Sequence, residues 1–228
     1  MIYDFNHRYY MRFIGVQANF IDVLDAKKVL DNAEDFLISL DTTSDQYVEV
    51  YPYFVEFFRP KKLLEKLDVV IGCGFTYSWM PTILKFKGED YRNELDQAVK
   101  ILNQHKSIST QEEIDFEQIE KLKPLINNSL VGLSKLLHFI NPAVFPIWDS
   151  RVYRFLKGAD AHINQLHLND ISYYASYVAY CHRVLKEDGA TGFVSKYRQK
   201  IDYEVSGIRA IEHLMFTQGK PKGNSVSD

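Results

Sequence analysis

Apolar residues along this chain recur mainly every three or four positions, which is the period of an α-helix. The pattern predicts helices over five segments, at residues 19–40, 89–103, 111–122, 171–186 and 206–216. In the second segment Leu95, Ala98 and Leu102 share one face and charged residues occupy the other, as in a helix on a protein surface. A break is expected near Asp25 in the first. The pattern therefore predicts a mainly α-helical fold.

The most hydrophobic predicted helix covers residues 129–140. Its polar positions are few: Ser129, Ser134, Lys135 and His138. A helix that is apolar nearly all round is buried on most of its sides. Asn141 and Pro142 follow as a stop signal, so we expect a buried helix that ends there.

Two segments have patterns that fit more than one element. Residues 45–58 alternate between apolar and polar like a strand, but Pro52 interrupts the alternation. Residues 67–74 (LDVVIGCG) fit a buried strand with a glycine turn, as in a nucleotide-binding unit. Tyr77, however, stands where the third glycine of that fingerprint belongs. We therefore favour a short hinge between two helical regions at 67–74.

The hydrophobic fraction of 46% is sufficient for a packed core, so residues 1–218 are predicted to form a single helical domain. A two-lobed arrangement of that domain, with a hinge near residues 72–88, is left open. Residues 219–228 (GKPKGNSVSD) contain turn-forming and charged residues but nothing to bury. This tail is therefore expected to be disordered.

The formal charge of −3 at pH 7 argues against a surface that is basic throughout. The charge is uneven, because residues 1–60 hold 5 Lys and Arg against 10 Asp and Glu, whereas residues 129–228 hold 12 against 9. A polyanionic partner would therefore meet the C-terminal half. The alternative is a chance scatter of charges over solvated faces.

Cysteine and histidine positions argue against a metal centre. Cys73 and Cys181 are far apart, and His162, His167 and His182 form no ligand pattern with Cys181. No metal or other cofactor is expected. No apolar run reaches the length of a membrane span, and the N-terminus is too polar for a signal peptide. We therefore expect a cytoplasmic protein without membrane contact, and the sequence leaves its oligomeric state open.

Lys135 and Asp149 are the residues around which chemistry is expected. A charged lysine is costly to bury, and burial lowers its pKa, which makes the amine nucleophilic near neutral pH. Asp149 follows the rigid apolar residues 145–148 (FPIW) at the start of the next helix, where backbone N–H groups favour an ionised carboxylate. The structural alternatives are that the lysine stem covers apolar neighbours while its ammonium reaches water, and that the aspartate is only a helix cap.

The order of these features resembles the helix–hairpin–helix DNA glycosylases, and most closely their bifunctional 8-oxoguanine glycosylase branch. It runs from Gly132 through the helix with Lys135 and a short loop to an apolar–Pro–apolar stretch, Asp149 and Arg151. SKLLHF followed by FPIWDSRV is also similar to uncharacterised bacterial proteins distantly related to those enzymes. The strong match covers about 25 residues within 131–156. It has one glycine in the hairpin and a shorter gap between Lys135 and Asp149 than the enzymes.

This resemblance implies a multi-helix bundle of the helix–hairpin–helix glycosylase type that binds double-stranded DNA and flips out a damaged base. Lys135 would attack C1′ of the sugar, and Asp149 would orient or deprotonate the lysine. The remaining candidate residues fall into a DNA-binding set (Gly132, Ser134, His138 and Arg151) and a base pocket (Tyr77, Trp79 and Trp148). The alternative for His138 and the aromatic residues is plain core packing, and for Arg151 a salt bridge.

Two other classes of function stay open at this point. The chain is alternatively a catalytically silent helix–hairpin–helix module that binds DNA through phosphates. The third hypothesis is a helical protein-interaction domain without nucleic acid, in phage defence or stress response. Salt-dependent DNA affinity would separate the first two hypotheses from the third.

Overall fold

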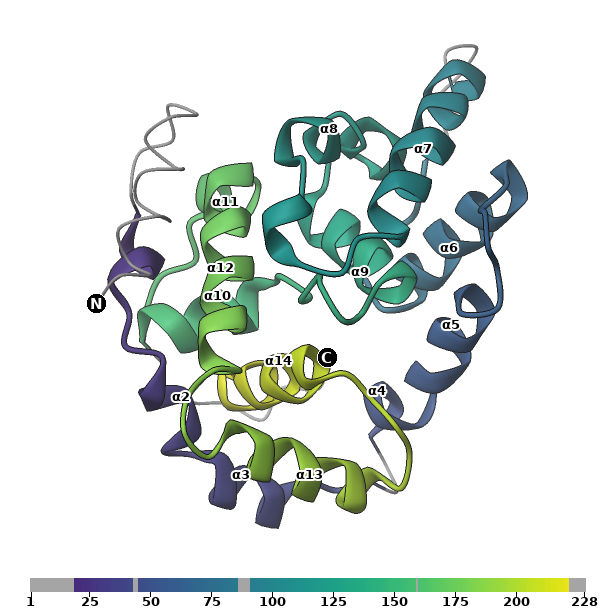
Figure 1. Cartoon of the computed structure of the whole chain (residues 1–228). Helices are drawn as coiled ribbons and strands as arrows, with labels where there is room; N and C mark the ends of the chain where they lie inside the picture. Colours follow the sequence, from purple (N-terminus) through teal and green to yellow (C-terminus); the bar gives the residue numbers. More distant parts are fainter. Residues whose placement is uncertain (1–18, 43–44, 86–90, 159, 222–228) are drawn as a thin grey trace.

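A computed structural model describes residues 19–42, 45–85, 91–158 and 160–221. Every regular element in these ranges is helical, and none of the described residues lies in a strand (Figure 1). The predicted mainly α-helical class is therefore confirmed.

The helices follow one another through short connections. The first part of the chain forms η1 (Phe20–Val23), α2 (Lys27–Leu30), α3 (Ala33–Ser39), α4 (Gln46–Glu49), α5 (Tyr51–Phe58), α6 (Lys66–Ser78) and α7 (Tyr91–Lys106). The middle forms η2 (Gln111–Glu113), α8 (Phe116–Glu120), η3 (Lys123–Ile126), α9 (Leu130–Ile140) and α10 (Ser150–Lys157). The last part forms α11 (Gln165–Leu168), α12 (Ile171–Val184), α13 (Ala190–Ile201) and α14 (Gly207–Gln218).

Two buried helices organise the packing. Helices α5, α6 and α7 and the 3₁₀ turn η3 pack against α9, and we call these the α9 group. Helices α3, α10, α12 and α13 pack against α14, and these are the α14 group. Figure 1 shows α14 crossing the middle of the molecule, with α10 and α12 on one side and α3 and α13 on another. The loop between α9 and α10 carries the chain from the first group to the second.

Several predicted helices have the expected place but different ends. Residues 19–40 form three short pieces, and the break between the first two includes Asp25 as predicted. Residues 111–122 also divide, into η2 and α8. The ambiguous residues 45–58 contain the helices α4 and α5. Pro52 lies in the first turn of α5, where its missing N–H breaks no helical bond, so it does not interrupt the helix. Helix α13 was not predicted.

The strand and hinge readings of residues 67–74 are both wrong, since the segment lies inside α6. Gly72 allows α6 to approach a neighbour closely, because it packs against side chains of the α9 group. The two-lobed arrangement with a hinge near 72–88 stays a prediction. Residues 72–78 of that range lie in α6, and residues 86–90 lie outside the described residues. Helices α6 and α7 both contact α9.

The C-terminal end is packed as far as Gly219, the first residue of the predicted tail. Gly219 is buried, and its carbonyl oxygen accepts a hydrogen bond of 2.9 Å from the Arg154 guanidinium. The last residues of the tail, 222–228, lie outside the described residues. Among the helices that are described, none is both long and apolar enough to cross a membrane.

Gly72 and Gly74 provide a matched test of this packing. A Cβ on Gly72 would lie 2.7 Å from side-chain atoms of both Leu136 and Phe58, which are fully buried, whereas one on Gly74 would meet nothing within 4 Å. We expect Gly72→Ala to lower the free energy of unfolding by about 1–3 kcal/mol through overpacking. Gly74→Ala should leave it unchanged or raise it by about 0.5–1 kcal/mol, because alanine favours a helix. Urea unfolding measures both, and equal effects would contradict the close approach of α6 to α9.

Candidate functional site

Lys135 lies on α9 with its ammonium group buried. The residue is 7% exposed, and Nζ donates a hydrogen bond of 2.9 Å to the carbonyl oxygen of Trp79. Trp79 is the C-cap of α6, and the carbonyl end of a helix carries partial negative charge. Burial lowers the pKa of Lys135, against the opposing effect of the carboxylates of Asp149 and Glu212. The ammonium therefore does not reach water as the structural alternative supposed.

Asp149 is the N-cap of α10, as predicted. Its Oδ1 accepts hydrogen bonds of 2.9 Å from the N–H of Arg151 and 3.0 Å from that of Val152. Burial raises the pKa of Asp149 above its usual range, although the Lys135 ammonium and the two N–H groups act in the opposite direction. The pKa shift thus runs against the expectation of a carboxylate held ionised.

Ser134 connects the segments that carry Lys135 and Asp149. Its Oγ accepts a hydrogen bond of 2.9 Å from the N–H of Trp148 and lies 3.2 Å from the carbonyl oxygen of the same residue. Ser134 precedes Lys135, and Trp148 precedes Asp149, so this contact brings the two candidate catalytic residues into one region. No hydrogen bond or ion pair joins the side chains of Lys135 and Asp149 among the described contacts, and the two interact through their charges.

A buried ion pair on α14 completes the charged region, and sequence reasoning missed it. Arg209 and Glu212 are 2% and 1% exposed and hydrogen-bond to each other. The guanidinium also donates to the carbonyl oxygen of Tyr47 at 2.9 Å and lies 4.6 Å from the ring centre of Tyr51. Burial raises the pKa of Glu212 to about 7, and the nearby Asp149 charge adds to the rise. In the sequence the pair has the spacing of an ordinary surface salt bridge.

His138 has the role of a core histidine rather than a DNA contact. It is fully buried, and Nδ1 lies 2.6 Å from the carbonyl oxygen of Phe145, so Nδ1 carries the proton. Nε2 then accepts from the hydroxyl of Tyr51 at 2.9 Å. Burial lowers the pKa of His138 to about 3. His138 is therefore a core residue whose two ring nitrogens both have hydrogen-bond partners.

The start of α9 is capped from within the protein, so two of the backbone N–H groups that could hold a phosphate there are already bonded. The N–H of Leu130 donates to Asn169 Oδ1 at 2.9 Å, and that of Gly132 to Ser129 Oγ at 3.1 Å. Gly132 is buried, and a Cβ there would lie 3.3 Å from Ile126. Gly132 therefore serves helix packing rather than the approach of a phosphate.

The turn between η3 and α9 is made by two asparagines. Asn127 and Asn128 have φ angles of 58° and 55°, in the left-handed region. Asparagine tolerates this region better than other residues with a side chain. The Asn127 amide also donates to the carbonyl oxygen of Ile83 at 2.9 Å. An adjacent pair of asparagines before the N-cap Ser129 was the sequence signal for this turn.

The three aromatic residues predicted to line a base pocket do not gather around Lys135. Trp148 is fully buried and packs against Tyr177, with ring centres 5.0 Å apart. The Tyr77 hydroxyl donates to the carbonyl oxygen of Ile126 at 3.2 Å. Only the half-buried Trp79 contacts Lys135, through its backbone. Core packing explains the fully buried Trp148, and the half-buried Tyr77 packs against the edge of the core.

Arg151, in the first turn of α10, is half-buried, and its guanidinium lies 4.6 Å from the ring centre of Phe216. Cations often stack on aromatic faces in this way. The contact joins α10 to the C-terminal part of α14. Arg151 was predicted to bind DNA beside Asp149. Part of its side chain instead packs against Phe216 within the fold.

Two surface cavities lie away from Lys135 and Asp149. One of about 200 Å³ is bounded by α5, Pro142 and residues 203–206, and a larger one of about 660 Å³ by residues 160–163 and Arg154. The described residues contain no cluster of three side chains suited to hold a metal ion. No family model, curated protein or solved structure matches the chain.

Ser134→Ala tests the connection between α9 and the residue before Asp149. The change leaves the buried N–H of Trp148 without its acceptor, so we expect the free energy of unfolding to fall by about 1–3 kcal/mol. Ser78→Ala is the control, because Ser78 also bonds to the carbonyl oxygen three residues earlier but holds no second segment. Ser78→Ala should change the free energy of unfolding by no more than about 0.5 kcal/mol. Equal losses in urea unfolding would remove Ser134 from this role.

His138 should remain neutral in mildly acidic solution. Its pKa of about 3 in the folded chain lies below the usual 6.5, so the unfolded chain binds more protons between these values. Acidification through this range therefore removes stability contributed by the neutral residue. Histidine ¹⁵N NMR from about pH 8 to about pH 5 should show the Nδ1-protonated neutral form throughout. A titration of His138 with a midpoint near 6.5 would contradict its burial.

Proposed function

We propose that the chain is a DNA glycosylase with associated lyase activity, in which Lys135 is the nucleophile and Asp149 its carboxylate partner. The observation that carries the proposal is the buried, desolvated Lys135 ammonium in the same charged region as the N-cap Asp149. Burial favours the neutral amine, which is the form that attacks an electrophilic carbon. The hairpin formed by η3, Asn127, Asn128 and α9 further supports a bundle of the helix–hairpin–helix glycosylase type.

The proposed reaction begins with neutral Lys135 and a flipped-out nucleotide. Nζ forms a bond to C1′ of the sugar while the bond from C1′ to the base breaks and the base leaves with the electron pair. A proton from the attacking amine passes to a carboxylate, for which Asp149 is the candidate. Opening of the sugar ring then gives an imine between Nζ and C1′. Borohydride reduces that imine to a stable amine and so links protein to DNA.

Access to Lys135 sets a requirement on this mechanism. Nζ donates to the Trp79 carbonyl oxygen, and the side chain is almost fully covered. A substrate reaches the amine only if the C-terminal end of α6 moves aside. The same movement would expose the half-buried indole of Trp79 beside the flipped nucleotide, where an aromatic face can stack on a base.

Lys135→Gln tests the nucleophile. Wild-type protein should form a borohydride-trapped complex with duplex DNA containing an abasic site or 8-oxoguanine, and Lys135→Gln should abolish it, because an amide forms no imine. Lys106→Gln is a matched control. Lys106 also donates to a helix-terminal carbonyl, that of Phe58 at 3.0 Å, and burial also lowers its pKa. Trapping by the control variant should equal that of the wild type.

Asp149→Asn separates the carboxylate charge from helix capping, because asparagine caps a helix about as well as aspartate. It should keep the helical circular dichroism spectrum of the wild type but slow trapping by at least about tenfold. Absence of trapping by wild-type protein on either substrate would overturn the lyase proposal. Salt-dependent DNA binding without trapping would then favour the silent DNA-binding module, and no DNA affinity the protein-interaction domain.

A further inference from the structure

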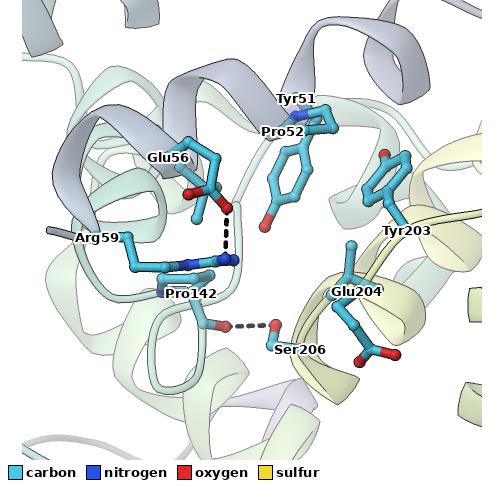
Figure 2. A pocket seen from close by; sticks show the side chains of 10 residues that line it. Tyr51, Pro52, Glu56, Arg59, Pro142, Tyr203, Glu204 and Ser206 are labelled. Atoms are coloured by element: carbon cyan, nitrogen blue, oxygen red, sulfur yellow. Dashed lines mark hydrogen bonds and ion pairs between the residues drawn. The ribbon is translucent and has the colours of Figure 1, made fainter.

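The cavity of about 200 Å³ near α5 is built from three separate parts of the chain. Figure 2 shows Glu56 of α5 and its C-cap residue Arg59 on one side, Tyr203 across from them, and Tyr51 between the two sides. Pro142 and Ser206 close the base of the cavity, where Ser206 Oγ donates to the carbonyl oxygen of Pro142 at 2.6 Å (Figure 2). A direct hydrogen bond therefore joins the two segments that form the base of the cavity.

The aromatic walls suit a flat ligand. Tyr51 and Tyr203 have nearly parallel rings, at 25° with centres 6.5 Å apart. Tyr51 is 2% exposed and forms a fixed wall, held by its hydroxyl bond to His138. Tyr203 is half-buried on the loop between α13 and α14, and its hydroxyl donates to the carbonyl oxygen of Val48 at 2.7 Å. The Tyr203 ring therefore offers a face that is positioned but still reachable.

The polar wall is an ion pair that a ligand can open at little cost. Glu56 and Arg59 are paired one helical turn apart, with side chains 54% and 59% exposed. Exposed pairs of this kind contribute little to stability, because water solvates both charges when they separate. The guanidinium offers neighbouring N–H donors in one plane, and the carboxylate offers two acceptors. Together they present donors and acceptors side by side at the edge of a flat ligand.

We propose that this cavity binds a guanine base, with the ring on Tyr203 and the edge on Arg59 and Glu56. Guanine offers the adjacent acceptors O6 and N7, which guanidinium groups bind in pairs. It also offers the adjacent donors N1–H and N2–H, which a carboxylate accepts in pairs, whereas the other three DNA bases have a single donor group on that edge. The volume is below the ~300 Å³ at which sites for drug-sized ligands begin, and so suits one base.

Lys135 and Asp149 do not line this cavity, so the site is independent of the proposed catalysis. A guanine reaches it either as a free nucleoside or as a base in a DNA single strand. Stacking on an aromatic side chain serves both sources. Titration of the full chain with guanosine, and with oligothymidylate carrying one central dG, distinguishes them. Saturable binding of guanosine assigns the site to the nucleoside, and binding of the oligonucleotide alone assigns it to the strand.

Isothermal titration calorimetry should show guanosine binding at least about tenfold more tightly than adenosine, cytidine or thymidine. Tyr203→Ala should weaken binding by at least about tenfold through loss of the stacking face. Tyr203→Phe keeps the face and loses only the bond to Val48, so it should stay within about twofold of the wild type. This pair separates stacking from the hydroxyl contact.

Glu56→Gln provides a second test if Tyr203→Ala does not fold, because Glu56 is on the exposed face of α5. It should weaken guanosine binding by at least about fivefold and leave the affinity for the other nucleosides unchanged. The proposal fails if guanosine and the dG oligonucleotide both show no saturable binding below about 1 mM. Equal affinity for all four nucleosides, or wild-type affinity in the variant tested, would also overturn it.

Discussion

The hydrogen bonds between Ser134 and the backbone of Trp148 hold the candidate site together. They fasten α9 to the loop that leads into α10, immediately before Asp149. Because each bond joins residues adjacent to Lys135 or Asp149, a small change there alters the relative position of both. The chain between Lys135 and Asp149 is thus closed by a direct contact between the segments that carry them.

Four ionisable side chains share the buried region that this contact creates. Lys135 comes from the α9 group, and Asp149, Arg209 and Glu212 come from the α14 group. A single buried charge is very costly, and the cost falls when opposite charges and hydrogen bonds accompany it. Two cationic and two acidic side chains meet this condition. The two helix groups are therefore coupled electrostatically where they meet, and the pKa values of Lys135, Asp149 and Glu212 depend on one another.

Tyr51 lies between this region and the cavity near α5. One side of its ring faces the Arg209 guanidinium, its hydroxyl bonds to His138, and it also lines the cavity. Tyr51 is buried and is held by these contacts, so the residue is a rigid wall common to both places. The charged region and the cavity therefore share a support without sharing reactive groups.

The sequence determined the helical class, the buried character of α9 and the capping of α10 by Asp149, because periodicity and capping depend on residues a few positions apart. It also pointed to the segment with Lys135 and Asp149. Only the tertiary structure decided the helical state of residues 67–74 and the roles of His138, Trp148 and the pair Arg209 and Glu212. Their roles depend on which helix covers which face, and that is set by contacts between distant residues. The same physics explains why Gly132, predicted for DNA binding, lies against Ile126.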